Sequence, residues 1–285
     1  MKKILVLGGT RFIGFAITKL LSEQFEVVCF HRGFNAPPQP LKIKEVFGDR
    51  MKPSDIQKAF SSDYDIVIDV SEQDSQAVST SAQLAANTVA KYIYISSSSV
   101  YKECHPFVYG VDSDLIEDEL SIYAQNKIKG EKHVQTYAQN FVILRIAKVY
   151  GPYNYIYREK YYYDKLKGDY QITLLNNPLF NFTFVDDVAQ AVLDSCNDVP
   201  SGIYNIAGSE NTKLSKFIDI IADIMGKSPR IENGTQTDAP FSHLSDCVLD
   251  CSKSNSVLNW KPTTDLYTGL LTTIQWIEKE AEYGT

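Results

Sequence analysis

Short, largely apolar runs alternate with helix-like segments through the first half of the chain. Each run is only a few residues long, which suits a strand buried on both faces, as the strands of parallel sheets are. The expected strands cover residues 4–7, 27–30, 44–47, 65–70 and 91–95. Helical or alanine-rich patterns lie between them over residues 12–22 and 74–90. The alternation predicts an α/β fold, a doubly wound parallel (Rossmann) sheet covered by helices on both faces.

The regular alternation of strand-like and helix-like segments ends at Gly151 and Pro152. Before this point, residues 141–146 form a sixth expected strand. After it, the runs 182–185 and 202–206 are expected to return to the main sheet. The pattern predicts a main domain and a smaller C-terminal lobe. The predicted boundaries are 1–150 joined by 182–207 for the main domain, and 151–181 with 208–285 for the smaller lobe.

Charge and composition argue against several classes of protein. Lys and Arg number 28 and Asp and Glu number 35, a formal net charge of −7, so a dedicated RNA-binding protein is not expected. Five scattered cysteines without a CxxC pair and four histidines without ligand spacing predict reduced thiols and no metal site. We find neither a signal peptide nor an apolar run approaching the length of about 20 residues that crosses a bilayer. A cytoplasmic protein without a membrane segment is expected.

Eight tyrosines fall within residues 150–170. We expect them to form a packed aromatic helix face between the lobes; a stacking platform for a base or sugar is the alternative. Nearby cations include Arg158 and Lys160, but Glu159 and Asp164 are interspersed with them. Because these carboxylates cancel much of the positive field, we expect no specific RNA binding at physiological salt.

A glycine-rich turn joins the first expected strand to the first expected helix. Glycines let such a turn bend tightly and approach a pyrophosphate, which the free N–H groups of the helix N-terminus then bind. This context favours a dinucleotide site over a merely structural turn. The candidate cofactor-binding residues of the turn are Gly8, Thr10, Arg11, Phe12, Ile13 and Gly14.

The turn resembles that of the extended short-chain dehydrogenase/reductases, the NAD-dependent epimerase/dehydratase family. Members place glycines at the first, fourth and seventh positions of the turn. Gly8 and Gly14 keep the outer two, whereas Arg11 replaces the middle one. The replacement is typical of an atypical subset that resembles the chloroplast stem-loop-binding proteins.

Three further segments follow in the order that the family uses. A serine-rich strand end at residues 96–101 precedes a YxxxK pair, Tyr123 and Lys127, and the stretch from Leu144 to Pro152 reads LRxxxVYGP. On a helix, residues four apart share a face. The resemblance implies catalysis by these groups, with Ser97 as the hydroxyl residue by its position in the strand end.

The chemistry of hydride transfer accounts for these residue types. A proton must be moved at the substrate oxygen, and an unperturbed tyrosine is a poor base at neutral pH. A neighbouring ammonium favours the phenolate. The resemblance therefore implies that Tyr123 is the acid/base, that Lys127 lowers its pKa and binds the nicotinamide ribose, and that Ser97 orients the substrate oxygen.

The end of the second expected strand bears on the choice of dinucleotide. NAD-specific members carry an Asp there, but this strand ends in His31 and Arg32. Arg11 and Arg32 are candidates for the 2′-phosphate of NADP, which we favour over NAD; two solvated surface arginines are the alternative. Asp49 matches the adenine-edge position, or else it merely shapes a turn.

Departures from the family pattern narrow the reaction. Ser98 and Ser99 stand where sugar dehydratases carry an Asp-Glu pair, which argues against dehydration. Epimerases acting on nucleotide sugars carry an Asn and two diphosphate-binding arginines where this chain has Lys148, Phe180 and His243. Phe cannot replace a bidentate Arg, which argues against a nucleotide sugar. The weaker substrate-site candidates are Lys148, Tyr101, Arg158 and His243.

These features together predict an NAD(P)-dependent oxidoreductase or epimerase that acts on a sugar-like or other hydroxyl or carbonyl substrate. A second copy of the chain, in a homodimer, is a further candidate partner. The alternatives are a non-catalytic or RNA-associated binding protein on the same fold and an NADPH-sensing regulator, because fold alone does not fix function.

Overall fold

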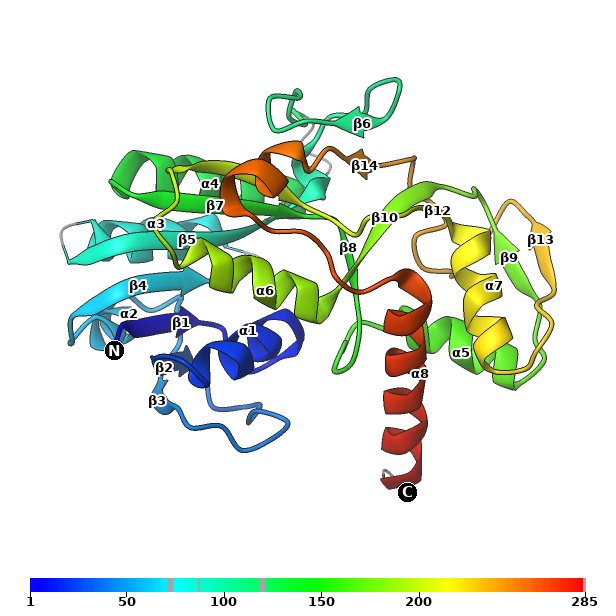
Figure 1. Cartoon of the computed structure of the whole chain (residues 1–285), viewed down its shortest axis with the longest axis horizontal. Helices are drawn as coiled ribbons and strands as arrows, with labels where there is room; N and C mark the ends of the chain where they lie inside the picture. Colours follow the sequence, from blue (N-terminus) through cyan, green and yellow to red (C-terminus); the bar gives the residue numbers. More distant parts are fainter. Residues whose placement is uncertain (71–73, 87, 118–120, 284–285) are drawn as a thin grey trace.

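A seven-stranded sheet forms the centre of the larger part of the molecule (Figure 1). The computed structural model describes residues 1–70, 74–86, 88–117 and 121–283. Within these residues the strand order is β11-β7-β5-β4-β1-β2-β3, and every pairing is parallel. The strands are β1 (Lys3–Leu7), β2 (Glu26–His31), β3 (Lys44–Phe47), β4 (Tyr64–Asp69), β5 (Val89–Ser97), β7 (Phe141–Ile146) and β11 (Gly202–Ile206).

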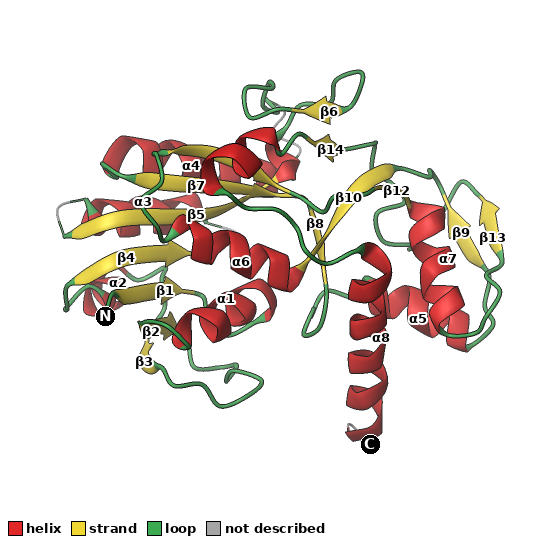
Figure 2. Ribbon diagram, viewed as in Figure 1, coloured by secondary structure: helices red, strands yellow, loops and turns green. Residues whose placement is uncertain are grey.

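Helices cover both faces of this sheet (Figure 2). On one face lie α1 (Phe12–Ser22) and α6 (Val185–Ser195), and on the other α2 (Pro53–Ala59), α3 (Ser75–Ala85) and α4 (Ile122–Tyr137). Side chains alternate along β1, so its even-numbered residues join one core and its odd-numbered residues join the other. The predicted doubly wound α/β sheet is confirmed.

A second apolar core lies beyond the main sheet. It contains α5 (Glu159–Lys167), α7 (Leu214–Ile224), α8 (Leu266–Tyr283) and the strand β10 (Leu179–Phe184). Here β10 pairs with β8 (Lys148–Tyr150) and β12 in a separate three-stranded sheet. The smaller elements are β12 (Asn211–Lys213), β6 (Val108–Tyr109) paired with β14 (Val248–Leu249), β9 (Ile172–Leu174) paired with β13 (Ile231–Asn233), and short helical turns at Ser98–Val100 and Ser254–Leu258.

The expectation that residues 182–185 return to the main sheet is therefore wrong. The edge beside β7 is taken by β11, which pairs with β7 along its whole length. The run at 182–184 pairs with β8 instead, and its last residues lead directly into α6. No helix in the described part of the chain combines the length and apolar character that crossing a membrane requires.

The tyrosine-rich segment supplies much of the second core. Tyr150, Tyr161, Tyr162 and Tyr163 are all buried there. The Tyr161 hydroxyl donates to Asp238 at 2.6 Å, and the Tyr162 hydroxyl donates to the Pro240 carbonyl. The expected packed aromatic helix face is thus found only in part: Tyr161, Tyr162 and Tyr163 pack from α5 and Tyr150 from β8 within the second core. Tyr155, Tyr157 and Tyr170 are exposed.

A buried ion pair fixes α4 against the main sheet. Arg145 of β7 donates from Nε and Nη2 to the two carboxylate oxygens of Glu131 of α4, at 3.0 and 2.7 Å. Both side chains are almost fully buried. The Ser96 hydroxyl of β5 also donates to Glu131, and Arg145 donates to the Val111 carbonyl. The pair thus joins one helix to two neighbouring strands.

We expect Glu131→Leu to destabilise the protein by about 3–5 kcal/mol, because it leaves the Arg145 guanidinium buried without its partner. The shift in the urea-unfolding midpoint measures this loss. Glu26→Gln is the matched control, since it removes an exposed pair with Lys44 and should change stability little. A Glu131→Leu protein as stable as the wild type would contradict this account of α4.

Candidate active site

Two adjoining cavities lie at the carboxyl ends of the central strands. The larger, of about 400 Å³, lies over the turn after β1 and the ends of β2 and β3. The smaller, of about 140 Å³, lies between the end of β5, α4 and β8. Phe12, Ile13 and Val70 line both cavities, so the two form one continuous site at the position where doubly wound sheets bind ligands.

Every residue that the sequence suggested for the cofactor, apart from Lys127, lines the larger cavity. These residues are Gly8, Thr10, Arg11, Phe12, Ile13, Gly14, Arg32 and Asp49. The structure therefore brings together side chains from the first turn, the end of β2 and the end of β3.

The glycine turn has the shape that a pyrophosphate requires. Gly8 has a φ of +90°, and a Cβ added to Gly14 would lie 2.1 Å from the Gly8 carbonyl oxygen. The chain can pass this closely only because both positions lack side chains. No side chain caps α1, whose N-terminus faces the cavity. Its free N–H groups and positive dipole end fit an anionic dinucleotide.

Two cations of the larger cavity lie against aromatic rings. The Arg11 guanidinium lies 3.5 Å from the centre of the Tyr155 ring, and that of Arg32 lies 5.6 Å from the centre of the Phe34 ring. Among the described residues neither forms an ion pair. The role of Arg11 and Arg32 in binding a phosphate of the cofactor stays a prediction.

The ends of β2 and β3 also have local roles in the fold. His31 accepts from the Gly33 N–H at Nδ1, and its Nε2 lies 2.9 Å from Glu45. The Asp49 carboxylate accepts from the Met51 N–H at 3.0 Å, so Asp49 does shape its turn. Its contact with an adenine amine stays a prediction.

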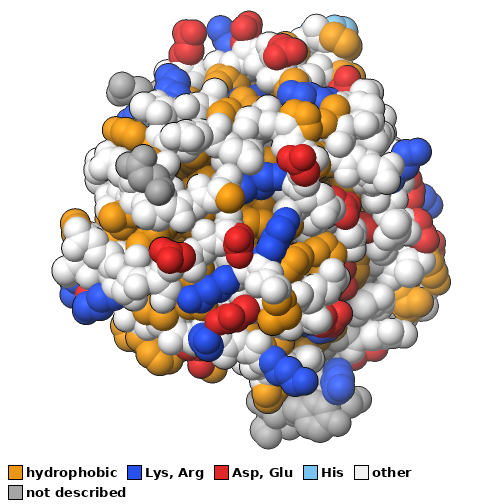
Figure 3. Space-filling model, turned by 60° about the vertical axis from the view of Figure 1, so that its left-hand side comes forward, with side chains coloured by type: hydrophobic (Ala, Val, Ile, Leu, Met, Phe, Trp, Pro, Cys, Tyr) orange, Lys and Arg blue, Asp and Glu red, His pale blue; other side chains and the backbone are white. Residues whose placement is uncertain are grey.

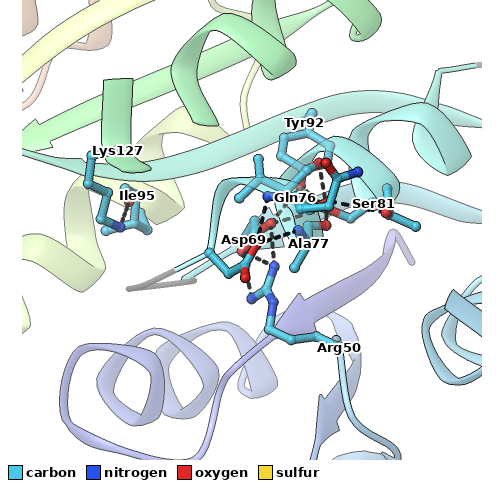
Figure 4. Close-up of polar contacts among 11 residues, drawn as sticks. Arg50, Asp69, Gln76, Ala77, Ser81, Tyr92, Ile95 and Lys127 are labelled. Atoms are coloured by element: carbon cyan, nitrogen blue, oxygen red, sulfur yellow. Dashed lines mark hydrogen bonds and ion pairs between the residues drawn. The ribbon is translucent and has the colours of Figure 1, made fainter. Parts of the chain in front are cut away.

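A buried network beneath the larger cavity was missed from the sequence (Figure 4). Arg50, which lines the cavity, donates from both Nη atoms to Asp69, the fully buried last residue of β4. The Tyr92 hydroxyl donates to the same carboxylate at 2.7 Å, and Ser81 donates at 3.2 Å. A charged residue inside an apolar strand needs such partners. The presence of Asp69 in the apolar run 65–70 was therefore the feature of the sequence that could have indicated this network.

The proposed catalytic residues line the smaller cavity. Tyr123 is 41% exposed, whereas Lys127 is almost fully buried. The Lys127 ammonium lies 5.9 Å from the centre of the Tyr123 ring and donates to the Ile95 carbonyl at 2.6 Å (Figure 4). Ser97, at the end of β5, accepts from the Ser99 N–H at 3.1 Å. Ser97, Tyr123 and Lys127 thus line one cavity, and of the three the Tyr123 phenol is the exposed group.

The four weaker substrate-site candidates separate into two pairs. Lys148 and Arg158 line the smaller cavity. Tyr101 and His243 line neither cavity: the buried Tyr101 hydroxyl donates to Asn205 at 2.5 Å, and His243 is exposed. Tyr101 serves the packing beneath the loops, where its ring stacks on Tyr109.

Glu159, at the start of α5, is a buried carboxyl beside this cavity. One oxygen accepts from Asn154 at 2.9 Å, and the other has no partner among the described residues. Burial raises the pKa of Glu159 to about 7. The native protein thus holds this proton up to neutral pH, whereas the unfolded chain releases it near the ordinary Glu pKa.

A raised native pKa gives stability that is present in acid and lost as pH rises toward and through about 7. We expect Glu159→Gln to remove this loss and to gain up to roughly 3 kcal/mol over the wild type at pH 8, at 1.36 kcal/mol per pKa unit. Urea unfolding at pH 5 and pH 8 measures the difference. Glu103→Gln, at an exposed carboxylate, is the control. Parallel pH profiles for wild type and Glu159→Gln would contradict the prediction.

The fold and the glycine turn define a dinucleotide-binding protein of the extended short-chain dehydrogenase/reductase type. The sequence profile described as NAD dependent epimerase/dehydratase family matches residues 4–207, and the chain belongs to that family.

Proteins that are similar to this chain in sequence or in structure have names that specify different functions. Chloroplast stem-loop binding protein of 41 kDa b, from Arabidopsis thaliana, is 26% identical over 94% of this chain and 77% of its own length. UDP-glucuronate 4-epimerase 1 of the same plant is 26% identical over 70% of this chain and 52% of its own length. The solved UDP-glucuronic acid 4-epimerase of Bacillus cereus, in complex with NAD and a fluorinated UDP-sugar acid, has a TM-score of 0.81 at 22% identity, covering 97% of this chain and 99% of that one.

Proposed function

We propose that this protein is an NADP-dependent oxidoreductase or epimerase that acts on a hydroxyl or carbonyl group of a sugar-like substrate. The observation that carries the proposal is the adjacency of the two cavities: Ser97, Tyr123 and Lys127 line one, the glycine turn lines the other, and Phe12 and Ile13 line both. Family membership and the NAD found in a related fold support a nicotinamide cofactor.

The residues of the smaller cavity supply the proton chemistry. When bound, a nicotinamide would supply the acceptor and donor of the hydride, the hydrogen and two electrons of a substrate C–H bond. Tyr123 accepts the hydroxyl proton as the carbonyl forms and gives it back in the reverse step. The buried Lys127 ammonium stabilises the phenolate, and Ser97 holds the substrate oxygen. Oxidation followed by reduction on the opposite face gives net epimerisation.

RNA binding, suggested by the name of one relative, is less well supported. Four of the eight tyrosines of the 150–170 segment are buried and offer no stacking surface, whereas Tyr155, Tyr157 and Tyr170 are exposed. Lys160 is paired with Asp164 at 2.7 Å. On the face shown in Figure 3, basic and acidic side chains are interspersed. A continuous basic groove, which single-stranded RNA requires, is not visible there.

We expect tighter binding of NADP than of NAD, and we expect Arg32→Ala to weaken NADP binding. Loss of one charge-assisted phosphate contact should cost roughly 1.5–3 kcal/mol. Fluorescence titration of both dinucleotides measures the difference, with NAD as the control ligand that lacks the 2′-phosphate. Equal affinity for the two dinucleotides, or unchanged NADP affinity in the variant, would rule out this preference.

We expect Tyr123→Phe to abolish turnover and to leave dinucleotide binding nearly intact, because only the hydroxyl group is lost. Lys127→Ala should damage both, since the ammonium serves the phenol and, by family resemblance, the nicotinamide ribose. Steady-state rates and cofactor titrations on the two variants test this pair of expectations. A Tyr123→Phe enzyme with most of its activity would mean that another group moves the proton.

A further inference from the structure

Two cations line the smaller cavity without an anionic partner. Lys148 is the first residue of β8, and Arg158 directly precedes α5. Among the described residues, neither belongs to an ion pair. Lys148 instead lies 5.3 Å from the centre of the Phe180 ring, and Arg158 lies 5.0 Å from that of Phe241.

This arrangement is unfavourable without a ligand. Burial lowers the pKa of Lys148; the nearby Cys247 thiol opposes this shift, and the charge of Arg158 adds to it. The neighbouring carboxyl group, Glu159, accepts a hydrogen bond from Asn154; the charge of Arg158 acts on it, but the two do not form an ion pair. Two like charges that face one cavity cost free energy, and an anion placed between them would reverse that cost.

The position of the cations relates them to the proposed chemistry. Ser97, Tyr123 and Lys127 line the same cavity as Lys148 and Arg158. An anionic group bound by the cations would thus leave the rest of a small molecule facing the Tyr123 hydroxyl.

The size and lining of the cavity limit what that molecule can be. Its volume of about 140 Å³ is below the roughly 300–1,000 Å³ of typical sites for drug-sized ligands. By the family resemblance, Phe180 takes the position of a diphosphate-binding Arg. The Phe180 ring is fully buried among Phe182 and Phe241. Both features favour a small substrate over a nucleoside diphosphate.

We propose that the substrate is a small hydroxy or keto compound with one anionic group, a carboxylate or a phosphate monoester, and that Lys148 and Arg158 bind this group. The inference rests on the proposed function, because it assigns the substrate class of the same site. It separates this chain from relatives whose names specify UDP-sugars.

Binding of simple anions tests the proposal directly. The full-length protein is saturated with NADP, so that phosphate cannot occupy the glycine turn, and its melting temperature is followed against inorganic phosphate, acetate, glucose and UDP-glucose. We expect phosphate or acetate to stabilise the protein. The dissociation constant should rise about tenfold or more in Lys148→Met and in Arg158→Gln, the loss of one charge-assisted contact. The phosphate and acetate arms distinguish the two anion classes.

Lys160→Gln is the matched control, because Lys160 lies on α5 outside the cavity and is paired with Asp164. It should leave anion binding within about twofold of the wild type. Anion binding that is insensitive to Lys148→Met and Arg158→Gln, or no binding of either anion, overturns the proposal. Stronger stabilisation by glucose or UDP-glucose than by both anions also overturns it.

Failure of the proposed function gives a different result. If neither dinucleotide binds, the oxidoreductase assignment fails, and the anion series is repeated on the protein alone. Dependence of anion binding on both cations would then still support an anion site, and its absence would remove both proposals.

Discussion

The placement of α4 depends on the ion pair between Glu131 and Arg145. Helix α4 carries Tyr123 and Lys127 near its start. Glu131 lies further along the helix, and its ion pair with Arg145 is buried, so water does not compete for it. Arg145 belongs to β7, and the Ser96 hydroxyl of β5 completes the carboxylate's partners. Replacing both members of such a pair by apolar groups need not reduce stability. The contribution of the pair to the structure is instead one of geometry, because the bidentate contact between guanidinium and carboxylate permits a single relative orientation of α4 and β7.

The first turn has a comparable role for the other cavity. Because Gly14 lies against the Gly8 carbonyl, α1 starts close to β1, and its first residues reach the boundary between the two cavities. Beneath the same region, Asp69 holds the guanidinium of Arg50, which extends from the loop between β3 and α2. The larger cavity is therefore backed by a buried, hydrogen-bonded carboxylate, whereas the exposed Tyr123 and the loop before α5 line the smaller one.

Much of the fold follows from short-range patterns in the sequence. Apolar runs predict the strands of the main sheet, and the glycine turn and the YxxxK pair indicate which strand ends meet. The partner of β10 could not be predicted, because an apolar run such as Phe182–Phe184 suits any buried strand. In the structure β10 pairs with the edge of β8, which the run itself does not indicate. Spacing also misplaced Tyr101, whose hydroxyl meets Asn205, far away in the sequence. The Arg50–Asp69 pair is missed for the same reason, because sequence spacing does not show which buried charge meets which partner.

The segment between β8 and α5 belongs to both cavities at once. Its Tyr155 covers Arg11 in the larger cavity, while Ile156 and Arg158 line the smaller one. Only two residues separate Tyr155 from Arg158, so a displacement at one is transmitted along the backbone to the other. A dinucleotide that repositioned this loop would change the affinity for the second ligand, and the second ligand would change the affinity for the dinucleotide by the same factor, because linkage is reciprocal.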